Sequence, residues 1–93
     1  MTKRVMSDEE MVARLIDRCI LLVAIDDDMP TERKLELEPM LNELAQALSL
    51  PEGDRDNARV RGLFDLSLEL GAESQDAQAL LGAVRNFVPL LQD

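Results

Sequence analysis

Residues 20–34 read ILLVAIDDDMPTERK, and this stretch decides the fold. An unbroken apolar run ends at Ile25, three aspartates follow, and Pro30 then precedes a mixture of charged and apolar residues. A proline is well tolerated as the first residue of a helix, because the amide that it lacks has no partner in that turn. The stretch therefore predicts the end of one helix, an acidic turn, and the start of a second helix at Pro30.

Apolar residues upstream of this turn recur at the three- and four-residue spacing of a helix. The sequence SDEE at residues 7–10 is a capping box, in which the Ser7 hydroxyl accepts a hydrogen bond from the Glu10 amide. Every position from Ile20 to Ile25 is apolar. We therefore expect the second half of this helix to be enclosed on nearly all sides, by other helices or by a second copy of the chain.

The acidic turn and the second helix follow from local chemistry. Carboxylates in the turn favour the positive N-terminus of the helix that Pro30 opens, and Asp28 is placed to cap it. Pro39 lies within the same segment, where a proline removes one hydrogen bond and clashes one turn back. We expect the second helix to be kinked or broken near Pro39 and to end between Ser49 and Pro51.

Two further helical patterns complete the chain. Asp54 or Asp56 caps the third helix, and Gly71 is placed to end it. Ser74 caps the fourth helix, whose apolar residues keep helical spacing until Pro89 ends or bends it.

Four amphipathic helices with short loops predict an all-α protein, either a small four-helix bundle or an irregular four-helix domain. The chain has 93 residues, a length that supports one hydrophobic core. We assign residues 1–6 to a flexible N-terminal tail and residues 7–93 to a single helical domain. Apolar residues make up 46% of the chain and aromatic residues 2%, so the core must be aliphatic.

The single cysteine, Cys19, excludes an intramolecular disulfide and favours a reducing compartment. It begins the longest apolar run, Cys19–Ile25, which is too short to span a bilayer. Acidic residues stand at positions 8–10, where a secretory signal requires basic flanks. These observations predict a cytoplasmic protein.

The formal net charge of −9 restricts the class of partner. Nucleic-acid binding relies on Lys and Arg to displace the counterions of phosphate, and anionic membranes also attract basic proteins. We therefore predict no direct binding to nucleic acid and no membrane association. A protein partner with a basic surface fits this charge better.

The residue types that most enzymes need are missing. The sequence has no His, Tyr or Trp, which removes the commonest general base and the commonest ligand of transition metals. Cys19 has no histidine to activate it, and the four glycines form no phosphate-binding loop. We predict that the protein is not an enzyme and uses no cofactor.

A calcium-binding loop requires oxygen ligands at alternate positions, a glycine at the sixth and a glutamate at the twelfth. Counted from Asp26, the sixth position is Thr31 and the twelfth is Leu37, so the pattern excludes an EF-hand. Weak binding of a divalent cation stays open as an alternative.

The apolar helix end, the acidic turn and the segment TERKLELEPMLNELAQALSL at residues 31–50 resemble the helical TerB-type tellurite-resistance domains, which carry acids at a helix junction. The resemblance covers roughly a third of the chain. Asp27-Asp28-Met29 stands where these domains usually have a glycine, so no ligand residue is carried over. The resemblance implies a weak divalent-metal-binding helical domain as an alternative function.

Our main functional prediction is a non-catalytic interaction module, such as an adaptor, inhibitor or chaperone-like protein, that binds its partner through an apolar groove with an acidic rim. The alternative from another class is an acidic mimic of nucleic acid that blocks a DNA- or RNA-binding protein. Basic residues interspersed among the acids argue against the mimic. They favour a mixed, solvated surface with pairs such as Glu10–Arg14.

Two sets of residues are candidates for contacts. We expect Arg55 and Arg59 one turn apart on the third helix, where they can grip acidic groups of a partner. The candidate partner-binding residues are Asp26, Asp27, Asp28, Glu32, Arg55, Arg59 and Arg61. A homodimer would have its seam on the first or the fourth helix, at Ile16, Ile20, Val23, Leu80, Val84 and Phe87.

Overall fold

The computed structural model describes residues 7–92, with the backbone alone for Glu52. All regular structure in this range is helical, which confirms the predicted all-α fold with four helices. The predicted N-terminal tail, residues 1–6, lies outside the described residues. The helices are α1 (Asp8–Ala24), α2 (Thr31–Ser49), α3 (Asn57–Leu70) and α4 (Gln75–Phe87), with short 3₁₀ helices η1 (Glu52–Asp54) and η2 (Pro89–Leu91).

Three helices begin with the side-chain caps that the sequence predicts. The hydroxyl of Ser7 accepts from the Glu10 amide at 3.2 Å, and that of Ser74 accepts from the Ala77 amide at 3.2 Å. Asp56, one of two candidate caps for α3, accepts from the Arg59 amide at 3.1 Å, and Arg59 is the third residue of that helix. Each cap satisfies one of the amides that a helix start leaves without a partner.

The predicted cap of α2 is wrong. The residue that precedes this helix is Pro30, and no side chain caps the start. Asp28 stands two residues too early, and its own amide donates to Oδ1 of Asp26 at 2.9 Å. The acidic turn therefore closes on itself instead of capping α2.

α2 is one continuous helix from Thr31 to Ser49, with Pro39 inside it and not at a break. The proline deprives the carbonyl of Leu35, one turn earlier, of its usual helical partner. Both Leu35 and Pro39 are exposed, so water can reach this carbonyl. Solvent at this face explains how the helix continues through the proline.

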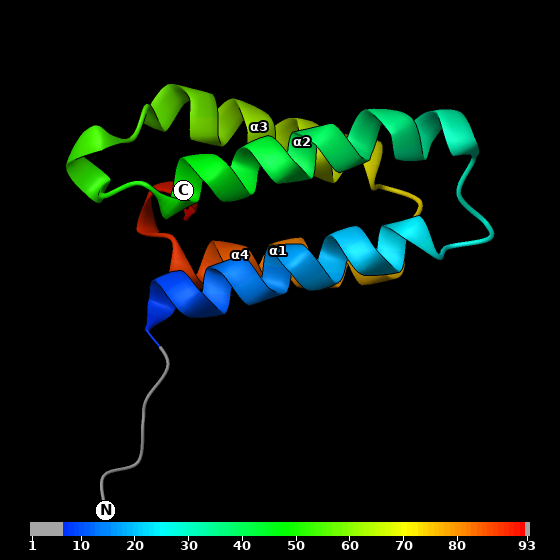
Figure 1. The fold of residues 1–93 in the computed structure, drawn as a ribbon, viewed down its shortest axis with the longest axis horizontal. Coiled ribbons are helices and arrows are strands. Elements are labelled where there is room, and N and C mark those ends of the chain that lie inside the picture. The colour runs from blue at the N-terminus through cyan, green and yellow to red at the C-terminus, as the bar shows by residue number, and fades with distance from the viewer. Residues whose placement is uncertain (1–6, 93) are drawn as a thin grey trace, which may run out of the picture.

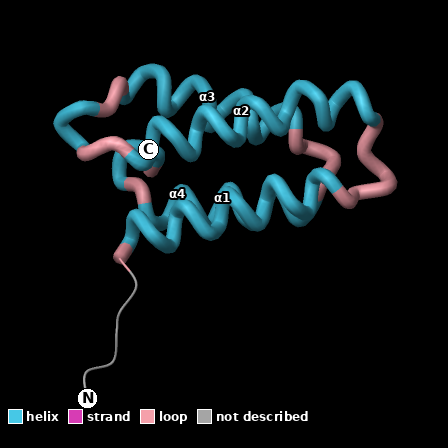
Figure 2. Tube along the Cα trace, viewed as in Figure 1, coloured by secondary structure: helices cyan, strands magenta, loops and turns pink. Residues whose placement is uncertain are grey.

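The four helices run up and down in two layers, with α1 and α4 in one and α2 and α3 in the other (Figures 1 and 2). α1 packs against both α4 and α2, and α2 packs against α3. The contact between α3 and α4 is the smallest of the four helix pairs. Within residues 7–92, no helix is long and apolar enough to cross a membrane.

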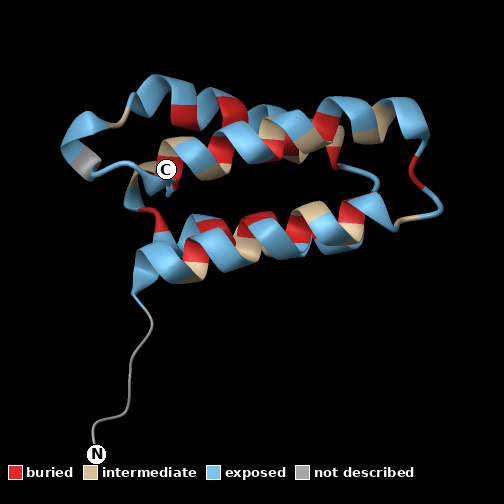
Figure 3. Cartoon of the chain, viewed as in Figure 1, coloured by how far each residue is buried: buried red, intermediate tan, exposed pale blue. Residues whose placement is uncertain are grey.

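The core is aliphatic and lies between the layers, where the buried positions of each helix face inward (Figure 3). Its one aromatic side chain is Phe64, which is fully buried, and the guanidinium of Arg85 lies 5.2 Å from the centre of the Phe64 ring. The expected enclosure of the end of α1 is wrong, because Leu21 and Ile25 are 60% and 63% exposed. α1 has helical neighbours on two sides only, so its outer face meets solvent whatever its residues are.

Long polar side chains cover the C-terminal ends of all four helices. The last carbonyl groups of a helix have no partner within it, and a cationic donor there also offsets the negative end of the helix dipole. α1, α2 and α3 have no basic residue in their own last turn, so the donor comes from elsewhere. The bonds are Lys34 to the carbonyl of Ala24, Arg55 to Leu48 and Leu50, Arg33 to Leu70, and Gln92 to Arg85 and Asn86.

This arrangement predicts a structural cost for removing Arg55. Its Nε donates to the Leu50 carbonyl at 2.8 Å and a terminal nitrogen to the Leu48 carbonyl at 2.9 Å. Because Arg55→Ala removes two charge-assisted bonds in a partly buried place, it should lower the free energy of unfolding by about 1–2 kcal/mol. Urea denaturation measures this, with Arg18→Ala on the exposed face of α1 as the control. Equal effects of the two substitutions would contradict the role given to Arg55.

Candidate functional site

The turn between α1 and α2 and the turn between α3 and α4 lie at the same end of the bundle (Figure 1). Together they line an open hollow of about 590 Å³ on the surface, which we call the acidic hollow. Its apolar lining is Leu22 and Ile25. The remaining lining residues are Asp26, Asp27, Asp28, Glu73, Ser74, Gln75 and Asp76.

The acidic hollow unites residues that the sequence keeps far apart. The three predicted aspartates line it together, whereas Glu32 is exposed in the first turn of α2 and does not line it. The sequence analysis missed Glu73, in the turn between α3 and α4, and Asp76, in the first turn of α4. An up-down order of the helices could have indicated them, because it brings the α1–α2 turn and the α3–α4 turn to one end of a four-helix bundle.

The charge of the hollow is of one sign. All five of its ionisable lining residues are acids. Arg33 and Lys34, the nearest basic residues in sequence, donate instead to the carbonyls of Leu70 and Ala24. The hollow therefore suits a cationic group next to an apolar one, because Ile25 is exposed within it.

No preformed metal-binding site is present at the acidic hollow or elsewhere among the described residues. Among residues 7–92, no group of three or more acidic or cysteine side chains has an arrangement that could hold a metal ion. Asp26 uses one carboxylate oxygen for the amide of Asp28. The weak divalent-cation alternative therefore has no set of ligands in the described part of the chain.

The three arginines do not form the expected patch. Arg55 precedes α3 instead of lying on it, since Asp56 is the cap, and its guanidinium is bound to carbonyls at the end of α2. Arg59 lies in the first turn of α3 and pairs with Glu43 at 3.0 Å across the α2–α3 surface. Arg61 is exposed on α3. The prediction that Arg55 and Arg59 lie one turn apart on the third helix is wrong, because α3 begins after Asp56, the later of its two candidate caps.

The predicted dimer seam falls largely inside the chain. Ile16, Val23 and Val84 are fully buried in its own core, so they cannot contact a second copy. Ile20 and Leu80 are partly buried, packed against that core. Phe87 is 36% exposed, the only one of the six with a large exposed surface.

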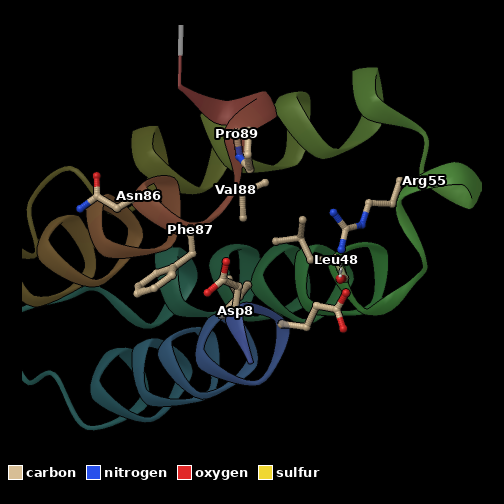
Figure 4. A pocket seen from close by; sticks show the side chains of 9 residues that line it. Asp8, Leu48, Arg55, Asn86, Phe87, Val88 and Pro89 are labelled. Carbon is tan, nitrogen blue, oxygen red and sulfur yellow. Dashed lines mark hydrogen bonds between the residues drawn. The ribbon is translucent and has the colours of Figure 1, made fainter. Parts of the chain in front are cut away.

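A second set of hollows lies at the opposite end of the bundle, where α1 begins and α2 and α4 end. One, the end cleft, has a volume of about 280 Å³, and Figure 4 shows its Leu48 and Val88 side chains lying between those of Arg55 and Phe87. The other, the side groove, has a volume of about 220 Å³ and lies between α1 and α2. The end cleft is lined by Asp8, Glu9, Val12, Leu48, Arg55, Asn86, Phe87, Val88 and Pro89, and the side groove by Glu9, Glu10, Val12, Ala13, Ala45, Leu48 and Ser49.

Cys19 is fully buried in the core, and burial raises the pKa of its thiol to about 11. The thiolate is the reactive form of cysteine, so burial and the raised pKa both make this residue inert. Cys19 therefore serves as a small apolar core residue, as its place in an apolar run indicates.

Comparison with known proteins adds no family to this description, since no family model, no curated protein and no solved structure matches the chain.

The raised pKa of Cys19 predicts a loss of stability in alkaline solution. The folded state holds this proton more tightly than the unfolded state, so the stabilisation is complete below the ordinary pKa of 9.0 and is lost as pH rises towards 11. Melting temperatures between these pH values should fall more steeply for the native protein than for Cys19→Ala, which lacks the titrating group. Parallel profiles would show that Cys19 titrates alike in both states.

The hydrogen bond within the acidic turn predicts unequal roles for its aspartates. Asp26→Ala removes the acceptor of the Asp28 amide and should lower the free energy of unfolding by about 0.5–1 kcal/mol. Asp27→Ala removes an equal charge that makes no hydrogen bond within the described residues, and relief of repulsion in the hollow should leave stability unchanged or slightly higher. Chemical denaturation of both variants checks this, and a larger loss for Asp27→Ala would be inconsistent with the geometry.

Proposed function

We propose that this chain is a non-catalytic interaction module that binds a protein partner with a basic surface at the acidic hollow. The observation that carries the proposal is the lining of this hollow, in which five acids and no base surround the exposed side chain of Ile25. The hollow is mainly polar, with Leu22 and Ile25 as its apolar part, and this combination of acids and apolar contact supports the proposal. Adaptor, inhibitor and chaperone-like roles all use such a surface.

The charge of the hollow supports recognition of a basic partner. Carboxylates gathered in a concave surface raise the local concentration of cationic groups and speed association, an effect that salt weakens. An exposed aliphatic side chain among them supplies contact area that salt affects much less. A partner with a lysine or arginine next to an apolar residue matches both properties.

The chemistry of the chain supports a role without catalysis. Cys19 is the strongest nucleophile in the sequence, and it is buried with a raised pKa. The chain contains no histidine that could activate it or act as a general base. The buried free thiol also suits a reducing compartment, so we place the protein in the cytoplasm.

The proposal is tested by capture of partners from a cell extract with two variants of equal charge. The hollow variant carries Asp27→Asn, Asp28→Asn and Glu73→Gln, and each change removes a carboxylate from the lining. The control variant carries Glu36→Gln, Asp65→Asn and Glu69→Gln, which are exposed outside the hollow. We expect the hollow variant to bind the captured partner at least about tenfold more weakly, a loss of about 1.4 kcal/mol of binding free energy. The control variant should bind it as the native protein does.

The outcomes of this capture separate the alternatives. Equal losses in both variants would show attraction by net charge alone, and undiminished capture by the hollow variant would exclude the hollow as the site. Capture dominated by nucleic-acid-binding proteins that added DNA displaces would favour the acidic mimic. Melting curves of both variants verify that each remains folded.

A further inference from the structure

The end cleft and the side groove adjoin, and we call the two together the trough. Glu9, Val12 and Leu48 line both, with the side groove between α1 and α2 and the end cleft reaching the end of α4. Its apolar lining comes from all three of these helices and from the residues after α4. The trough lies at the opposite end from the acidic hollow and shares no residue with it.

The rim of the trough is negative. Asp8, Glu9 and Glu10, in the first turn of α1, all line it. α2 and α4 both end beside it, and Arg55 offsets the negative end of α2, so the carboxylates supply the charge of the rim. Arg55 is the one basic residue in the lining, and its guanidinium is hydrogen-bonded to the last carbonyls of α2.

We propose that this trough is a second docking surface, which takes a short cationic amphipathic segment of a partner protein. Apolar side chains of the segment would cover Ala13, Ala45 and Phe87, and its lysine or arginine side chains would meet the acids of the α1 first turn. Recognition of an amphipathic helix by an apolar groove follows this pattern, with charges at the groove edge setting the orientation.

Charge complementarity selects this occupant over a second copy of the chain. Each copy carries a net charge of −9, and pairing two troughs face to face would bring two acidic first turns together. Like charges placed opposite one another at an interface disfavour that pairing. A cationic segment instead gains from the same acids.

The test uses a fluorescent amphipathic helical peptide of leucine and lysine, its leucine–glutamate counterpart, and two arginine variants. Ala13 is exposed and lines the trough, whereas Ala79 is exposed on α4 and lines neither the trough nor the acidic hollow. Ala13→Arg and Ala79→Arg therefore add the same side chain and charge to helix surfaces that tolerate it. Both arginine variants are made in the hollow variant, so that the acidic hollow does not compete for the peptide. We expect the leucine–lysine peptide to bind and the leucine–glutamate peptide not to bind, with affinity at least about tenfold weaker for Ala13→Arg and changed less than about twofold for Ala79→Arg.

Each other result overturns the proposal. Equal weakening in both arginine variants would show attraction by net charge, and equal binding of the two peptides would show that the rim does not select a cation. Loss of peptide binding in the hollow variant itself, before any arginine is added, would place the peptide in the acidic hollow instead. A dimer seen by light scattering that Ala13→Arg dissociates would identify a second copy as the occupant.

Discussion

The bundle is built around its aliphatic core, and long side chains add hydrogen bonds to the C-terminal ends of its helices. Arg33 and Lys34, neighbours in the first turns of α2, donate to the ends of α3 and α1 respectively. α2 packs against both of those helices, so two adjacent residues join it to each neighbour. Arg55 completes the pattern at the other end of α2. The bonds to the Leu70 and Leu48 carbonyls are partly buried, where a carbonyl left without a partner costs more stability than it does in water.

The same bonds determine where charge is left over. Four basic side chains are held by contacts within the chain. Three of them, Arg33, Lys34 and Arg55, donate to carbonyl groups, and Arg59 pairs with Glu43. The acids are held by fewer constraints and collect in the turns and first turns of the helices. A chain with nearly twice as many acids as bases therefore has a surface of mixed charge along its helices and strongly acidic places at its ends.

Most local chemistry could be predicted from the sequence, with the cap of α2 as the exception, and contacts across the chain could not. The caps at Ser7 and Ser74 depend on residues within one turn, so their patterns predict them directly. The exposure of Leu21 depends on how many helices surround α1, which no local pattern reports.

The candidate sites divide in the same way. The acidic turn was evident, but its partnership with Glu73 and Asp76 follows only from the up-down order of the helices. Arg55 was expected to face a partner, and it binds the chain's own carbonyls because α3 starts after Asp56.

Placement of the two acidic surfaces at opposite ends has a physical consequence. α1 has 17 residues, and at about 1.5 Å per residue its ends are roughly 25 Å apart. This separation exceeds the Debye length of about 8 Å at physiological ionic strength, so a charge bound at one end is screened from the other. The aliphatic core separates the two surfaces that we propose for cationic groups. If both proposals hold, a single copy of the chain binds two basic segments at once, which is the property that an adaptor needs and that an inhibitor of a single site does not.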